Sequence, residues 1–288
     1  MLMLRAAIST ILLAIGGTVA SDETVVYSGP QPGEAVPPLK VVLAYTDTEH
    51  AAVANFAPAS AAKPTLLVFV NGANRPAARL TRVLMNYSEM RADDGLSAGV
   101  VWLNDDHHEA REYLRKSISW WGTGLPVGVS VDGSEGPGSY GLNRNVNVTV
   151  LVTNKNRVTA NFALIQPSET DASAILAEVV KLIGGSIPTK AETILLSMPT
   201  RKLSDAKWHT APQDIHFRRL LCKLLSARNE QAAAAAAEAV EQYVHGNARR
   251  RHNLAQVAES LGKGRTNVGA IPAAKYLRSW RTDSIGGR

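Results

Sequence analysis

The sequence predicts an α/β domain followed by a smaller, mainly helical extension. In the first part, apolar β-type runs alternate with helical patterns, and the last two strands form a hairpin before a closing helix. This order is typical of a sheet with right-handed crossovers. Charge separates the second part: residues 21–189 carry 13 Lys+Arg and 17 Asp+Glu (net −4), whereas residues 190–288 carry 17 and 8 (net +9). Such asymmetry indicates two units.

The first 20 residues have the pattern of a secretory signal. Arg5 provides a positive n-region, residues 8–15 a short apolar h-region, and residues 18–20 (Thr-Val-Ala) a small-residue cleavage site. An uncleaved anchor is the alternative, although the apolar run is short for a membrane span. No cysteine follows the h-region, which argues against a lipid-anchored protein. We therefore expect an exported protein, periplasmic or secreted.

The elements of the α/β part are predicted from hydrophobic periodicity and from the residues that typically start and stop helices and strands. Strands are expected at residues 40–45, 66–70, 96–103, 127–131, 146–153 and 158–164, and residues 51–62 are expected to cover a sheet edge. Helices are expected at residues 75–90, 106–118 and 168–183, the last stopped by a Gly-Gly pair. In the extension, residues 231–244 include six consecutive alanines and are a strong helix by propensity, and residues 254–261 and 272–280 have helical patterns.

One strand-to-helix junction carries a family resemblance. Residues 65–70 are an apolar run, and Asn-Arg-Pro-Ala at 74–77 opens the next helix. This pattern resembles the strand–Cys-Gly-Pro-Cys–helix of the thioredoxin and peroxiredoxin-like (redoxin) superfamily. On that alignment Asn74 and Ala77 occupy the two cysteine positions. Neither side chain can form the thiolate on which the family's chemistry depends.

A second segment strengthens the resemblance. Residues 140–152 (Tyr-Gly-Leu-Asn-Arg-Asn-Val-Asn-Val-Thr-Val-Leu-Val) look like the family's Tyr-Gly-Val…Val-Pro-Thr-Thr-Phe-Leu-Ile-Asp, and Asn147 then replaces the cis-proline that faces the thiol. The resemblance spans residues 31–185. It implies a thioredoxin-like three-layer α/β sandwich over residues 21–188, with residues 189–288 as a basic helical extension.

The resemblance also implies a degenerate active site. Peroxiredoxins place a threonine where this chain has Asn71. They also have a downstream arginine; the arginine nearest to that position in this chain is Arg144, which is displaced by three residues. The degenerate positions are Asn71, Asn74, Arg75, Pro76, Ala77 and Asn147. We therefore expect a non-catalytic binding or scaffolding module. The alternative is an atypical redoxin-type oxidoreductase that works through Cys222 or through a partner's thiols.

The residues give little support for a reactive cysteine, a metal site or a nucleotide-binding motif. Cys222 is the single cysteine, so it forms no internal disulfide, and its amphipathic surroundings favour a buried, inert thiol. Residues 105–109 (Asp-Asp-His-His-Glu) could ligate a metal, but adjacent histidines on a helix diverge, and helix capping explains the cluster better. Residues 136–141 match G-x-G-x-x-G without the required strand and helix. We expect no cofactor and no metal.

Two features are candidate binding surfaces. Trp121 follows another tryptophan; either one of the pair is exposed toward a partner, or both are partly buried. Arg249, Arg250 and Arg251 form a basic cluster suited to an anionic partner, such as an envelope protein, a membrane surface or the chain's own acidic part. Export argues against nucleic acid. Ordinary surface charge without a partner is the alternative.

Overall fold

The computed structural model describes most of the chain. The described residues are 26–44, 53–56, 62–72, 74–121, 125–198, 215–263 and 271–282. The predicted signal segment lies outside them, as do the side chains of Trp121 and Arg249.

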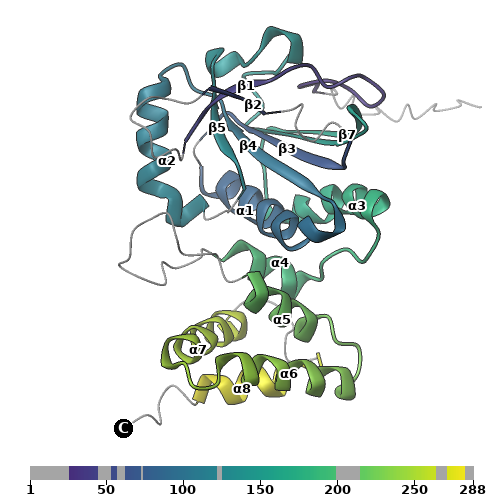
Figure 1. Cartoon of the computed structure of the whole chain (residues 1–288), viewed down its shortest axis with the longest axis vertical. Coiled ribbons are helices and arrows are strands. Elements are labelled where there is room, and N and C mark those ends of the chain that lie inside the picture. The colour runs from purple at the N-terminus through teal and green to yellow at the C-terminus, as the bar shows by residue number, and fades with distance from the viewer. Residues whose placement is uncertain are drawn as a thin grey trace, which may run out of the picture.

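The α/β part is built on one mixed sheet (Figure 1). Within the described residues its seven strands follow the order β2-β1-β5-β4-β3-β6-β7. Their bounds are β1 Lys40–Leu43, β2 Val53–Asn55, β3 Thr65–Val70, β4 Ser97–Trp102, β5 Val127–Ser130, β6 Val148–Asn154 and β7 Arg157–Leu164. β3 pairs in parallel with β4 and β4 with β5, whereas the β1–β2, β1–β5, β3–β6 and β6–β7 pairs are antiparallel. The segment expected to cover an edge thus includes β2, which forms that edge.

Three helices cover one face of the sheet. They are α1 Arg75–Met90, α2 His107–Trp121 and α3 Ala172–Ile183. On β3, Leu66, Val68 and Val70 pack toward these helices, whereas Leu67 and Phe69 pack into a second cluster on the opposite face. Both sets are buried, which explains why β3 reads as a continuous apolar run.

The opposite face is covered by irregular chain. Buried residues of the segment before β1 and Tyr140 pack there, and Tyr140 donates its hydroxyl hydrogen bond to Pro37 O at 2.8 Å. The Tyr140 ring lies 5.2 Å from that of Phe69. Tyr140 ends the 3₁₀ turn η4 Gly138–Tyr140, which follows η3 Gly133–Glu135. The glycine-rich loop therefore serves as turn structure.

These features confirm the predicted thioredoxin-like α/β fold class; the expected three-layer arrangement differs in that irregular chain, and not helices, forms the layer on the opposite face. The order β4-β3-β6-β7, with α1 crossing from β3 to β4 and α3 closing the chain after the β6–β7 hairpin, is that of a thioredoxin-like fold. The hairpin turns at Lys155 (φ 49°) and Asn156 (φ 59°). Two positive φ angles in a two-residue turn match the right-handed twist of the flanking strands.

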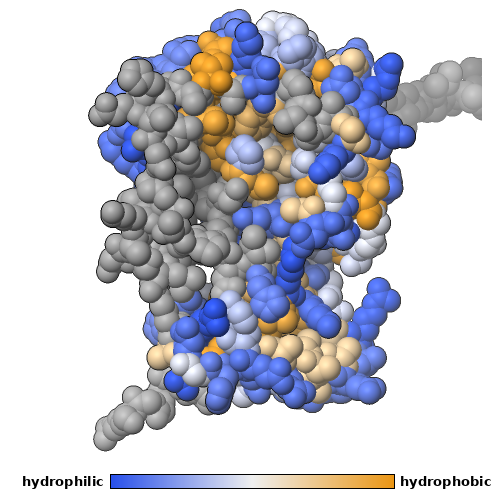
Figure 2. All heavy atoms as spheres, viewed as in Figure 1, coloured by the Kyte–Doolittle hydropathy of each residue, from blue (hydrophilic) through white to orange (hydrophobic). Residues whose placement is uncertain are grey.

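Among the described residues, five helices form the extension, which lies below the sheet in Figure 1. Their bounds are α4 Lys190–Ser197, α5 Ile215–Leu225, α6 Glu230–Val244, α7 Ala248–Lys263 and α8 Ala274–Thr282. They share their own hydrophobic cluster. Figure 2 shows hydrophilic side chains over most of this part and a paler patch over α6, where Ala232, Ala234 and Ala235 are exposed.

The two parts meet along α1. Leu196 of α4 belongs to the α/β core, and Cys222 of α5 packs against it. As a result, residues 80–88 of α1 are all buried, on the side that faces the sheet and on the side that faces the extension. A helix that is buried all round is normally apolar, yet this stretch includes Thr81, Arg82 and Asn86.

Candidate functional site

The start of α1 is the position that the sequence resemblance aligns with the redoxin thiol. Asn74 is the N-cap residue, and its Oδ1 accepts a hydrogen bond from Ala77 N at 2.8 Å. This bond satisfies one of the backbone donors that a helix start leaves unpaired. Arg75 and Pro76 are exposed in the first turn, while Ala77 is fully buried. The two residues that the resemblance aligns with cysteines therefore have structural roles: Asn74 caps the helix and Ala77 packs in the core.

The Asn147 loop lies against this junction, as the resemblance implies. Asn71 N donates to Asn147 O at 2.9 Å, and a Cβ added to Gly72 would lie 2.8 Å from Asn147 Oδ1. Glycine at 72 thus permits the close approach of the two loops. Asn147 Nδ2 in turn donates to Ile165 O at 2.6 Å, which connects the start of β6 with the end of β7.

Arg144 is used in the same network. Its carbonyl accepts a 2.9 Å bond from Asn71 Nδ2, and its guanidinium pairs with Glu135. The structure therefore brings Asn71, Asn74, Arg144 and Asn147 into adjoining loops. The hydrogen bonds described for the side-chain amides of Asn71, Asn74 and Asn147 have backbone partners: Arg144 O, Ala77 N and Ile165 O. None of the side chains of these four residues is a nucleophile or a general base.

Cys222 lies at the other end of α1. Its Sγ lies 4.0 Å from Sδ of Met90, the last residue of α1. A helix of 16 residues is about 24 Å long, so Cys222 is remote from Asn74. Burial raises the pKa of the Cys222 thiol to about 12, with a smaller contribution from Glu192. The thiol is thus protonated at neutral pH, and only the thiolate is a strong nucleophile.

A polar clasp joins α1 to α4. Asn86 Nδ2 donates to Leu196 O at 2.7 Å, and Arg82 Nη1 donates to Ser197 O at 2.6 Å. These carbonyls end α4, where no intrahelical donor remains for them. Burial is the main cause that lowers the pKa of Arg82 to about 10, with smaller contributions from Arg218 and Arg79. The polar residues of α1 thus satisfy the end of another helix.

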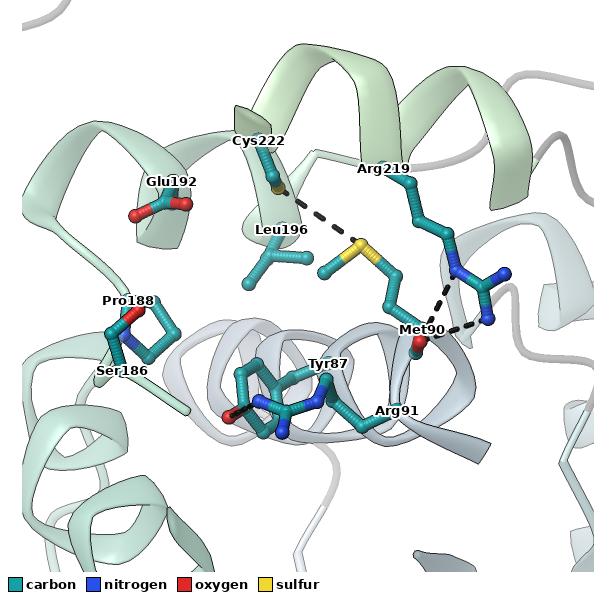
Figure 3. A pocket seen from close by; sticks show the side chains of 9 residues that line it. All are labelled: Tyr87, Met90, Arg91, Ser186, Pro188, Glu192, Leu196, Arg219 and Cys222. Carbon is teal, nitrogen blue, oxygen red and sulfur yellow. Dashed lines mark hydrogen bonds between the residues drawn. The ribbon is translucent and has the colours of Figure 1, made fainter. Parts of the chain in front are cut away.

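Beside the clasp is a cavity of about 210 Å³ (Figure 3). Four segments enclose it: the end of α1, the linker from α3 to α4, α4 and α5. Figure 3 labels its nine residues, which include Glu192 on α4, Arg91 beyond α1 and Arg219 on α5. The sequence does not indicate this cavity, because its residues come from three regions that are far apart in the chain: residues 87–91, 186–196 and 219–222.

The remaining candidates are placed as follows. Arg250 lies over the Tyr243 ring, with its guanidinium carbon 4.1 Å from the centroid, and donates to Tyr243 O at 3.2 Å. Arg251 is exposed. The side chains of Arg249 and Trp121 lie outside the described residues. Arg250 therefore has a packing role that the sequence reading did not anticipate.

The acidic segment after β4 caps α2. Glu109 N donates to Asp106 Oδ1 at 2.9 Å, the bond expected of a helix cap. No group of three or more His, Cys, Asp or Glu among the described residues could hold a metal ion. Within the same ranges, no helix is both long and apolar enough to cross a bilayer.

Comparison with known proteins gives only distant likenesses. No family model matches the chain, and no curated protein matches it. Similar solved structures include a DsbE-type thiol:disulfide interchange candidate from Chlorobium tepidum (15% identity, TM-score 0.41, 56% of this chain and 100% of that one). An uncharacterized conserved protein from Geobacillus kaustophilus is 14% identical (TM-score 0.42, 58% and 88%). A thiol:disulfide interchange protein from a Bacteroides species is 12% identical (TM-score 0.38, 56% and 94%). Likenesses this distant say nothing about activity.

Proposed function

We propose that this chain is an exported thioredoxin-fold protein that lacks thiol redox chemistry and acts as a binding or scaffolding module. The observation that carries the proposal is the start of α1, where Asn74 caps the helix and Ala77 is buried in the core. A redoxin needs an accessible, low-pKa thiolate at this place. The chain's single cysteine is about a helix length away and has a raised pKa.

The proposed binding surface is the rim formed by the loops of Asn71, Asn74 and Asn147. Hydrogen bonds within these loops preorganise them, so that little conformational entropy would be lost when a partner binds. Arg75 is exposed at the rim and offers a cation to an incoming chain. The proposed partner is a protein of the cell envelope. Export itself rests on the pattern of residues 1–20.

The decisive experiment compares catalysis by three versions of residues 21–288. Insulin disulfide reduction and peroxide consumption are measured for the wild type, for Cys222→Ser, and for the combined Asn74→Cys, Arg75→Gly and Ala77→Cys variant, which restores the family motif. We expect the wild type and Cys222→Ser to match the protein-free rate. Turnover by the wild type that Cys222→Ser abolishes would instead establish the atypical oxidoreductase.

A further inference from the structure

The cavity beside the polar clasp is large enough to hold a small molecule. Its volume of about 210 Å³ equals about seven water molecules at roughly 30 Å³ each. It lies where the helical extension packs against the α/β part, between the sheet core and the helical cluster. Binding pockets occur preferentially at such junctions.

The charged groups of the cavity lie on different walls. Glu192 is on α4; its Oε2 accepts a 2.7 Å bond from Thr189 N, and no cation among the described residues forms an ion pair with it. Arg91 and Arg219 are on other segments, as Figure 3 shows. Arg219 donates through Nε and Nη2 to Met90 O, and its Nη2 also donates to Asp93 Oδ2 at 2.8 Å in an ion pair; no partner is described for its Nη1. Arg91 forms an ion pair with Asp94 and donates through Nη2 to Gly184 O. The cavity is thus lined by one carboxyl group for which no cation partner is described and by two guanidinium groups that each have a carboxylate partner outside the lining.

Between these walls the lining is apolar or neutral. Leu196, Met90 and Pro188 contribute aliphatic and thioether surface, and the thiol of Cys222 is protonated. Tyr87, whose pKa is raised mainly by burial, is also neutral at pH 7 and hydrogen-bonds to Arg91 at 2.8 Å. A ligand that matched this lining would carry an ammonium group, a carboxylate and a short apolar group.

We propose that this cavity binds a small zwitterion of the α-amino-acid type. The ammonium group pairs with the Glu192 carboxylate, the carboxylate accepts hydrogen bonds from Arg219 and Arg91, and the apolar side chain contacts Leu196 and Met90. Such a ligand neutralises the one carboxyl group of the cavity that lacks a cation. It also bridges α1, α4 and α5, so its binding stabilises the junction of the two parts.

The pH dependence of binding follows from Glu192. Burial raises the pKa of this carboxyl above its ordinary value, and bonds from Thr189 and Ser226 partly offset the effect. Tyr87 and Cys222, which face it from α1 and α5, carry no charge at neutral pH. An ammonium ligand favours the ionised carboxylate, so binding releases a proton wherever Glu192 is partly protonated. Affinity therefore rises with pH through the Glu192 titration and then levels off.

The test is isothermal titration of residues 21–288 with L-leucine and L-methionine, alongside two analogues of each: the N-acetyl derivative, which lacks the ammonium group, and the amide, which lacks the carboxylate. Charged hydrogen bonds are worth enough that each deletion should weaken binding by about tenfold or more. Glu192→Gln should weaken binding of the free amino acids similarly. Glutamine at this position can still complete the capping box with Thr189, so the fold is retained.

Two tryptophan variants locate the site. Ser186 is exposed and lines the cavity, so Ser186→Trp should block it, whereas Ser260→Trp, on an exposed position of α7, should bind like the wild type. Absence of binding at millimolar amino acid, equal binding of the N-acetyl derivatives, or full binding by Ser186→Trp would each overturn the inference. The proposed function concerns the opposite end of α1 and would be unaffected by any of these results.

Discussion

At the scale of single residues, the start of α1 is stabilised by the side chain of Asn74. An asparagine carboxamide accepts the hydrogen bond that a helix start requires, and a thiol in the same position would do so poorly. We therefore expect Asn74→Ala to destabilise the fold by about 1 kcal/mol, while Asn74→Asp keeps most of the stability. Urea unfolding of both variants measures the difference. Equal loss in the two would contradict the capping role.

Cys222 leads to a second prediction at this scale. Its pKa of about 12 in the folded chain lies above the value of about 8.5 in an unfolded chain. The folded state thus retains a proton that the unfolded state releases, so the thiol's contribution to stability is present below about pH 8.5 and is lost as the pH rises toward 12. Iodoacetamide at pH 8 should modify Cys222 only after denaturation, whereas rapid alkylation of the folded chain would disprove the raised pKa.

At the scale of elements, the clasp between α1 and α4 makes a testable contribution to stability. Asn86→Leu keeps the side-chain volume but leaves Leu196 O buried without its donor, which typically costs about 1–3 kcal/mol. We expect faster hydrogen exchange in α4 and a lower free energy of unfolding. Asn253→Leu on α7 is the matched control, because no hydrogen bond is described for its side chain. An equal effect in the two variants would argue against the clasp.

Some of these elements could be predicted from the sequence and others could not. The run at β3, the turn at Lys155 and Asn156, and the polar cap before α1 are signalled by local chemistry, so they could be predicted. The clasp could not, because Thr81, Arg82 and Asn86 look like the solvent-facing side of an amphipathic helix. Only the packing of α4 against α1 makes them interior. The cavity also depends on the packing of α4 against α1, so it could not be predicted from the sequence either.

At the scale of the whole molecule, the charge split predicts where anionic surfaces bind. Changing Arg249, Arg250 and Arg251 to glutamine should reduce retention on heparin or anionic vesicles more than changing Lys63, Arg115 and Lys116 of the α/β part. The binding should weaken steeply with salt, because screening shortens to roughly 8 Å at physiological ionic strength. Retention that is insensitive to salt, or equal in the two triple variants, would indicate that the basic residues are ordinary solvated surface charges without a partner.

The role of Arg250 in packing requires a further control in that experiment. Because it stacks on Tyr243, its replacement should also cost about 0.5–1 kcal/mol of stability. Arg251→Gln alone, at an exposed position, separates the loss of charge from the loss of packing. Circular dichroism of each variant before chromatography keeps the two effects distinct.

The burial of α1 on two sides has a consequence for how this sequence can change over time. A helix at a protein surface tolerates substitution with a rhythm of three to four residues, because its outward positions accept many side chains. Between residues 80 and 88 no position of α1 faces water. The rhythm should be absent there, and nine neighbouring residues should vary only together with their contacts on the sheet or on the extension. Through α1, substitutions in the two parts of the chain should therefore be correlated with each other.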